Sequence, residues 1–433
     1  MATKEWLGNA QAVAQVRNWV FAGTWEATDI NDVTINGNTV SVSAGSTVIA
    51  TLGATLAAAL NALTIPEFAE ITWSFATATL TATGDNIGQP FSVSITTRDI
   101  GGAADAQTID GTTTSTGTDA TTATGPNDVS NTANWSGGSL PVDNDTIDVS
   151  RSVSMLYGLT ALSGINAIVQ IHSSFWAGGG QIGLPKVNGS GSSAYYEYRA
   201  LNLLLDGAKA GSYIGDGNGR GSSILNIDLG TGNFELTVND TPSPVDATRK
   251  AVALFGNPGA AVDGKLEVLS GSVDFCPNAA TGKVTARIGY KTNQIGDSIV
   301  AFGSGVTHGA TLEMSGGTVE VNSALTALNK TGGELTINGS GSCATYQNYK
   351  GPAYINTTGA FGATVNFTGR EGLTSFVRDM SAKDIDGTFL LAAGAKLHDP
   401  HGVCNVFAWK VDAGGAIKDV EVLGPPAKTY TAS

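Results

Sequence analysis

Three segments repeat one residue pattern between positions 266 and 341, and this repeat restricts the fold more than any other feature. The segments are Leu266–Phe275, Leu312–Val321 and Leu335–Gly341, and a weaker copy lies at Arg287–Tyr290. The copies start at Leu266, Ile288, Leu312 and Leu335, which are 22, 24 and 23 residues apart. A regular period in the twenties indicates stacked supersecondary units.

Each copy has the pattern of a strand, a tight corner and a second strand. Apolar and polar residues alternate, as in a half-buried strand, and Gly or Ser stands at the corner. Stacked units of this kind bury one continuous core. We therefore expect an all-β fold, a right-handed parallel β-helix (β-solenoid) over residues 127–406, preceded by a small α+β domain.

The composition suits short strands and excludes two classes of partner. Charged residues make up 14% of the chain, against roughly 25% in an average soluble protein. Gly accounts for 57 of 433 residues, and such residues suit tight corners. The net charge is −14 and no basic patch is visible, so neither nucleic acid nor a membrane is an expected partner.

The N-terminal residues and the cysteines suggest where the chain folds. The first eight residues lack the basic and apolar regions of a secretory signal. Cys276, Cys343 and Cys404 lie far apart and are odd in number, so we expect folding in a reducing cytoplasm. The residue usage, rich in Thr, Asn, Ser and Gly, resembles that of an extracellular particle. These features together fit a virion protein that folds in the host cytoplasm and is released by lysis. An ordinary cytoplasmic protein and a protein secreted by another route stay open as alternatives.

Residues 1–100 read as a separate attachment module. Asn36-Gly37 lies between two alternating strands and predicts a hairpin. Thr51 to Leu63 has helical spacing of leucines, and further strands follow. Residues 101–126 are rich in Gly, Thr and Ala, which predicts a flexible linker or an extended strand that crosses to a neighbouring subunit.

Two stretches carry a resemblance to known families. The segments Val33–Gly37, Leu56–Leu63, Ala69–Trp73 and Leu80–Phe91 resemble small modules of bacteriophage and prophage virion proteins. The segment Asn134–Val149, with Trp135 and Pro141, resembles the first turn of parallel β-helix proteins of the tailspike, tail-fibre or capsid-decoration type. The resemblance implies a structural role in a virion. The Pro-containing tail, residues 407–433, is expected to cap or leave the β-helix.

Parallel β-helices also include glycan-cleaving enzymes, so we considered carboxylate pairs. A glycosidase needs two carboxyl groups roughly 5–10 Å apart. Glu313 and Glu334 are 21 residues apart, and Asp206 and Asp228 are 22 apart, so each pair could lie on adjacent rungs. The alternative is that these polar side chains simply face water, and this alternative is favoured.

Two further groups are weak candidates for sites. His398, His401 and Cys404, with Asp399, offer zinc ligands within seven residues, but their spacing fits a turn equally well. Trp19 and Trp25 and the run Tyr195, Tyr196 and Tyr198 are candidate interface residues, since aromatic side chains favour half-buried positions. No cofactor-binding motif appears.

We expect a non-enzymatic virion structural protein, attached by its N-terminal module as capsid decoration or tail fibre. Its expected partners are other virion proteins, two further copies in a homotrimer, and a host-surface glycan. Two alternatives stay open, namely a tailspike glycan depolymerase and a cell-surface adhesin.

Overall fold

The computed structural model describes most of the 433 residues. The ranges outside the description are 102–105, 184–186, 189–194, 197–201, 216–224, 240–251, 279, 290–297, 360–366, 370, 377–382, 386–388, 392–393, 407–408, 412–420 and 425–433.

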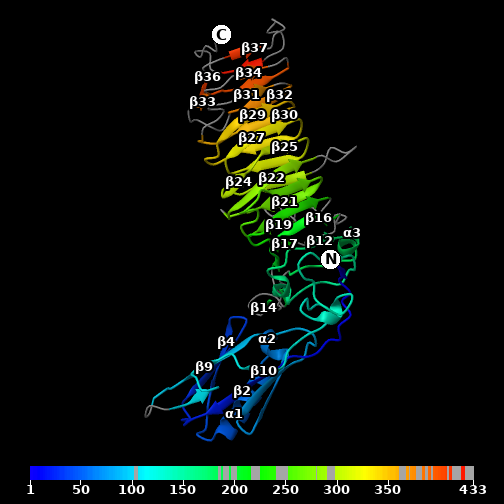
Figure 1. Ribbon diagram of the computed structural model, residues 1–433. Helices are drawn as coiled ribbons and strands as arrows, with labels where there is room; N and C mark the ends of the chain where they lie inside the picture. The colour runs from blue at the N-terminus through cyan, green and yellow to red at the C-terminus, as the bar shows by residue number, and fades with distance from the viewer. Residues whose placement is uncertain are drawn as a thin grey trace.

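The larger part of the chain forms two parallel sheets, and the prediction of a closed right-handed β-helix is wrong. One sheet has 14 strands and the other has 11, and together they build a long column (Figure 1). The 14-stranded sheet contains, in order, β1 (Thr3–Glu5), β11 (Thr146–Val149), β12 (Ile168–Ile171), β16 (Ala208–Ile214), β18 (Phe234–Val238), β20 (Gly264–Val268), β22 (Gly282–Ile288), β25 (Thr311–Met314), β27 (Leu325–Lys330), β29 (Cys343–Asn348), β31 (Phe367–Gly369), β34 (Phe389–Leu391) and β37 (Trp409–Val411), with β24 (Val306–His308) paired to β22. The 11-stranded sheet contains β15 (Leu203–Leu204), β17 (Leu225–Asp228), β19 (Val252–Phe255), β21 (Gly271–Phe275), β23 (Ser298–Phe302), β26 (Thr318–Val321), β28 (Glu334–Ile337), β30 (Gly351–Ile355), β32 (Gly372–Ser375), β35 (Lys396–His398) and β38 (Glu421–Leu423).

Along most of the column the chain alternates between the two sheets, so strands that follow each other in sequence do not pair with each other. Residues 266–341 occupy neighbouring strands of both sheets, but the sequence repeat misaligns them. Leu266 and Leu312 lie in the 14-stranded sheet, whereas Leu335 lies in the 11-stranded sheet, opposite Val319. The local pattern of alternation is the same on both sheets, which is why the period alone did not distinguish them.

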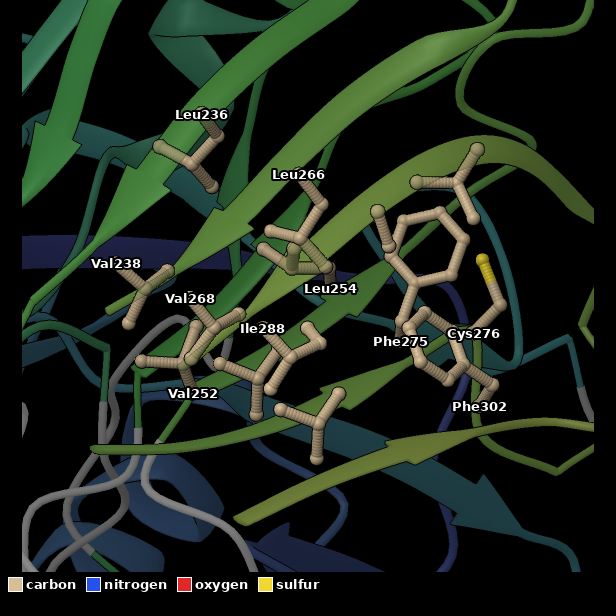
Figure 2. Packing of buried hydrophobic residues seen from close by; sticks show 14 of the residues in the cluster. Leu236, Val238, Val252, Leu254, Leu266, Val268, Phe275, Cys276, Ile288 and Phe302 are labelled. Carbon is tan, nitrogen blue, oxygen red and sulfur yellow. The ribbon is translucent and has the colours of Figure 1, made fainter. Parts of the chain in front are cut away.

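The inward side chains of the two sheets form one apolar core. Leu236 and Leu266 lie in register, as do Val238, Val268 and Ile288. Figure 2 shows these side chains packed with Leu254, Phe275 and Phe302, which come from the 11-stranded sheet. The same core cluster runs from Trp6 to Val403, so the column is one packed unit.

The N-terminal domain has a separate core between two antiparallel sheets. One sheet contains β10 (Thr118–Thr121), β2 (Val16–Ala22), β6 (Thr79–Gly84) and β5 (Ile71–Ala76), with β8 (Thr108–Ile109) paired to β2, and the other contains β4 (Asn38–Ser43), β3 (Ile30–Ile35), β7 (Val93–Arg98) and β9 (Thr114–Ser115). Strands β8, β9 and β10 come from the Thr-rich segment 101–126. Their pairing ties this segment to β2 and β7 of the domain.

The hairpin and the helix predicted for this domain are both present. Asn36 and Gly37 have positive φ angles of 49° and 86° at the turn between β3 and β4, as a two-residue hairpin turn requires. Helix α1 (Ile49–Asn61) buries Leu52, Leu56 and Leu60. It packs on β5, and a short helix, α2 (Pro66–Ala69), follows it.

The first residues of the chain belong to the column rather than to the N-terminal domain. Strand β1 pairs in parallel with β11, and Trp6 is fully buried beside Trp135. After Trp6 the chain enters the N-terminal domain, and it returns to the column antiparallel to the segment by which it entered. An isolated β-bridge joins the two segments at Val13 and Thr124. Figure 1 accordingly shows the N terminus at the base of the column and β37 at its far end.

The remaining elements are short. They are the 3-10 helices η1 (Thr132–Asn134) and η2 (Leu159–Leu162), helix α3 (Ser173–Ala177), and two two-stranded sheets, β13 (Val187–Asn188) with β14 (Tyr195–Tyr196) and β33 (Lys383–Ile385) with β36 (Cys404–Val406). Of the predicted C-terminal tail, β37 and β38 each pair with a large sheet.

Candidate binding surface

A continuous row of side chains crosses the 14-stranded sheet at one register position. The row begins at Glu5 and lies next to the buried positions, which alternate with it along each strand. Its members, in order, are Glu5, Asp148, Gln170, Tyr213, Thr237, Glu267, Arg287, Glu313, Asn329 and Gln347. We call this row the polar ladder. Its members stack about 4.8 Å apart, the spacing of neighbouring strands.

Charges alternate in sign at the centre of the polar ladder. Arg287 lies between two carboxylates, 3.5 Å from Oε1 of Glu267 and 3.4 Å from Oε2 of Glu313. Beside the ladder, Nζ of Lys265 lies 3.1 Å from Oε2 of Glu235. The side chains of these pairs are 35–68% exposed, so each pair contributes little to stability. They do present a dense pattern of charge to a partner.

The sheet surface is hollowed at the same place. One hollow of about 170 Å³ is lined by Glu235, Lys265, Glu267 and Arg287, with Thr237 and Thr285. An adjoining hollow of about 430 Å³ shares Glu235 and Lys265 and extends to Asn166 and Lys209. The two hollows adjoin at Glu235 and Lys265, and we call them together the groove. Leu236, Leu266 and Phe234 share its lining with the hydrogen-bonding side chains, a mixture that suits a hydroxyl-rich or peptide ligand.

A second group of polar side chains lies nearer the base of the column. The Tyr213 hydroxyl contacts the His172 ring at 2.7 Å from Nδ1, and Nε2 of His172 lies 3.4 Å from Oδ1 of Asp148. Burial raises the pKa of the Tyr213 phenol, and the Asp148 carboxylate raises it further. The phenol therefore stays neutral and acts as a hydrogen-bond donor.

The structure does not bring Glu313 and Glu334 together. Glu313 is in β25 of the 14-stranded sheet, where it pairs with Arg287, and Glu334 is in β28 of the 11-stranded sheet, opposite Thr318. The two strands belong to different sheets because consecutive strands alternate between the sheets. The spacing of 21 residues therefore does not stack the two side chains.

Asp206 and Asp228 lie near each other but serve the backbone at two corners. Asp206 Oδ1 accepts a hydrogen bond from the amide of Thr231 at 3.2 Å, and Asp228 Oδ1 accepts one from Gly230 at 2.9 Å. Both carboxylates therefore stabilise turns by accepting backbone hydrogen bonds.

The candidate zinc ligands have other partners where they are described. Nδ1 of His398 lies 3.1 Å from the Ser375 hydroxyl, and Asp399 accepts a hydrogen bond from the amide of Val403. His401 is exposed, and the Cys404 side chain lies outside the described residues. Within the described part of the chain, no three His, Cys, Asp or Glu side chains gather as they would around a metal ion.

The aromatic interface candidates fall into two groups. Trp19 and Trp25 are fully buried in the core of the N-terminal domain, where they pack against Trp73 and Phe21. Neither is therefore available on the surface. Tyr195 and Tyr196 form β14, which pairs with β13, but their side chains, and all of Tyr198, lie outside the described residues.

Sequence reasoning missed Glu267, Arg287, Lys265 and Tyr213. A signal for the first of these was present, because Glu267 and Glu313 occupy the same position in two copies of the repeat. The weak copy was aligned on Ile288 instead of Ala286, so Arg287 was not placed between the two glutamates. No local sequence signal indicated Tyr213. Its place in the polar ladder depends on the pairing of β16 with β12 and β18.

Comparison with protein-family profiles, curated proteins and solved structures finds no match for this chain. None of the helices in the described residues has the length and apolar character needed to span a membrane.

Proposed function

We propose that this chain is a non-enzymatic structural protein of a bacteriophage particle. In this proposal the N-terminal domain attaches to other virion proteins and the two-sheet column projects from it, as capsid decoration or as part of a tail fibre. The resemblance of residues 33–91 to virion modules supports the particle assignment.

The observation that carries the proposal is the pair of separate cores. One core belongs to the N-terminal domain, and a single core runs the length of the column. A small domain with its own core, joined to a long packed column, suits attachment at one end and presentation of a surface along the other. The groove lined by Glu235, Lys265 and Arg287 supplies such a surface.

Immunoelectron microscopy of particles purified from the producing culture tests the assignment. Antibody raised against the purified protein should label intact particles, and the labelled position should distinguish head from tail. Protein that stays in the soluble fraction and never labels particles would contradict the proposal. Purified free protein, run through the same gradient, controls for sedimentation of the protein alone.

We include a homotrimer and a host-surface glycan ligand in the proposal. Light scattering should give the mass of three chains of 44.0 kDa each. A monomeric mass would overturn that part. Glycan array binding should be weakened by Arg287→Ala, and Lys350→Ala, remote from the groove in sequence, serves as the control.

Incubation with host polysaccharide separates this proposal from a glycan depolymerase. We expect no increase in reducing ends. An increase that is lost in Glu313→Gln would replace the structural proposal with an enzymatic one.

A further inference from the structure

Lys330 ends strand β27 with its side chain fully buried in the column. Its exposed fraction is 0%, and it is the only lysine or arginine that is buried among the described residues. Burial of an ammonium group without a carboxylate partner is costly. No ion pair to Lys330 occurs in the described part of the chain, so its environment requires another explanation.

Asn348 lies directly beside Lys330. The two residues are paired in register on the neighbouring parallel strands β27 and β29, and Asn348 is also 0% exposed. Nζ of Lys330 lies 3.2 Å from Oδ1 of Asn348 and also donates a hydrogen bond to the carbonyl of Lys350. The amine is therefore held next to a carboxamide, and neither side chain is exposed to solvent.

The carboxamide of Asn348 is held firmly from its other side. Its Nδ2 donates to the carbonyl of Leu373 at 3.1 Å and to that of Gly351 at 3.3 Å. A side chain at Gly372 would meet the Cγ of Asn348 at 2.7 Å, so glycine leaves only enough room for the amide. These contacts hold the carboxamide in place beside Lys330.

Burial also prepares the amine for reaction. It lowers the pKa of Lys330 to about 8, although the charge of Glu334 acts in the opposite direction. A measurable fraction of the side chain is then a neutral amine at pH 7, which is a nucleophile. The buried Tyr346 hydroxyl, 2.7 Å from the Thr374 hydroxyl and hydrogen-bonded to Asn348, supplies a proton donor beside the amide.

We propose that Lys330 and Asn348 react to form an intramolecular isopeptide bond across β27 and β29. Nζ attacks Cγ of Asn348, a new C–N bond forms, and the Cγ–Nδ2 bond breaks. A proton from Nζ passes to the departing nitrogen, with the Tyr346 hydroxyl as relay, and ammonia leaves. No oxidant, reductant or further reactant is needed, and proximity supplies much of the rate.

Mass spectrometry of the denatured full-length protein tests the proposal. The mass should lie about 17 Da below that of the sequence, through loss of one ammonia. Cleavage after glutamate should then yield peptides 321–334 and 335–371 as one branched species, because Glu334 separates the two partners in the sequence. Linkage of the two peptides excludes cyclisation at an Asn-Gly pair such as Asn338-Gly339, which also releases ammonia but joins no peptides.

Three variants complete the test. Lys330→Met and Asn348→Ala should both show the full sequence mass, whereas Asn348→Asp should lose about 18 Da as water. Lys350→Met, which alters the neighbouring lysine, should keep the loss of ammonia. A wild-type protein of full mass, or one with separable peptides 321–334 and 335–371, overturns the proposal even if the variants do not fold.

Discussion

The indole rings of Trp6 and Trp135 meet edge to face with their centroids 5.2 Å apart, and this contact fastens the start of the chain to the base of the column. Both side chains are buried, and the indole nitrogen of Trp6 donates to the carbonyl of Val153 at 2.7 Å. The N-terminal domain is thus an insertion between β1 and β11 and is held by two crossings of the chain.

Trp6→Ala should destabilise the column, since it removes a large buried side chain and the contact with Trp135. The expected loss is about 3–5 kcal/mol, measured by urea denaturation. Lys4→Ala, two residues earlier in β1 and with its ammonium group on the exposed Ser139 hydroxyl, is the matched control and should change stability by less than about 1 kcal/mol. Equal stability of Trp6→Ala and wild type would show that β1 does not dock on β11.

Asn134→Ala should loosen the junction between the two parts of the molecule. The buried carboxamide accepts a hydrogen bond from Ala10 at 2.7 Å and donates to Gly125 at 2.7 Å, one residue on each crossing of the chain. Unpaired buried backbone groups would cost about 1–3 kcal/mol each. Limited proteolysis should cut faster between residues 7 and 13 or between 121 and 127. Ser139→Ala should leave the cleavage rate unchanged, and unchanged cleavage of Asn134→Ala would refute this role.

The column should lose stability in acid through His308. Burial lowers the pKa of His308 from 6.5 to about 4, so the folded state resists protonation while the unfolded state accepts a proton near pH 6.5. Stability from this group is fully present above pH 6.5, falls as the pH drops from 6.5 to 4, and levels off below 4. A shift of this size corresponds to about 3 kcal/mol.

Denaturation midpoints measured from pH 7 to pH 4 check this prediction. His308→Gln keeps a polar side chain near the Ser323 hydroxyl, which lies 3.3 Å from Nε2 of His308, but does not titrate. The slope of stability against pH should be shallower in this variant. The same slope in both proteins would assign the acid sensitivity to other groups.

Gly53→Ala should destabilise the N-terminal domain because helix α1 lies very close to β5. A Cβ atom at Gly53 would lie 2.1 Å from the ring of Phe75, so the helix or the ring must move. Overpacking of this kind typically costs about 1–3 kcal/mol. Ala54→Ser, at the exposed neighbouring position, should stay within about 0.5 kcal/mol of wild type in thermal denaturation. An unchanged melting temperature of Gly53→Ala would contradict the close packing.

Local patterns predicted local structure well. Asn36-Gly37 marked the β3–β4 turn, and Leu52, Leu56 and Leu60 marked the buried face of α1, because turn dihedrals and helical spacing depend on neighbouring residues. The alternating residues of 266–275 marked β20 and β21. Prediction failed where pairing decided the outcome, as for Glu313 and Glu334, which the alternation of the chain assigns to separate sheets.

The sequence by itself determined that short alternating strands with glycine corners would stack in parallel and bury one side, since side-chain period and turn preferences are properties of the local chain. Tertiary structure alone decided that the strands form two sheets, that Trp6 returns to Trp135, and that Lys330 meets Asn348. Those relationships depend on which distant strands share a hydrogen-bonded register, and alternating patterns that look alike do not specify a partner.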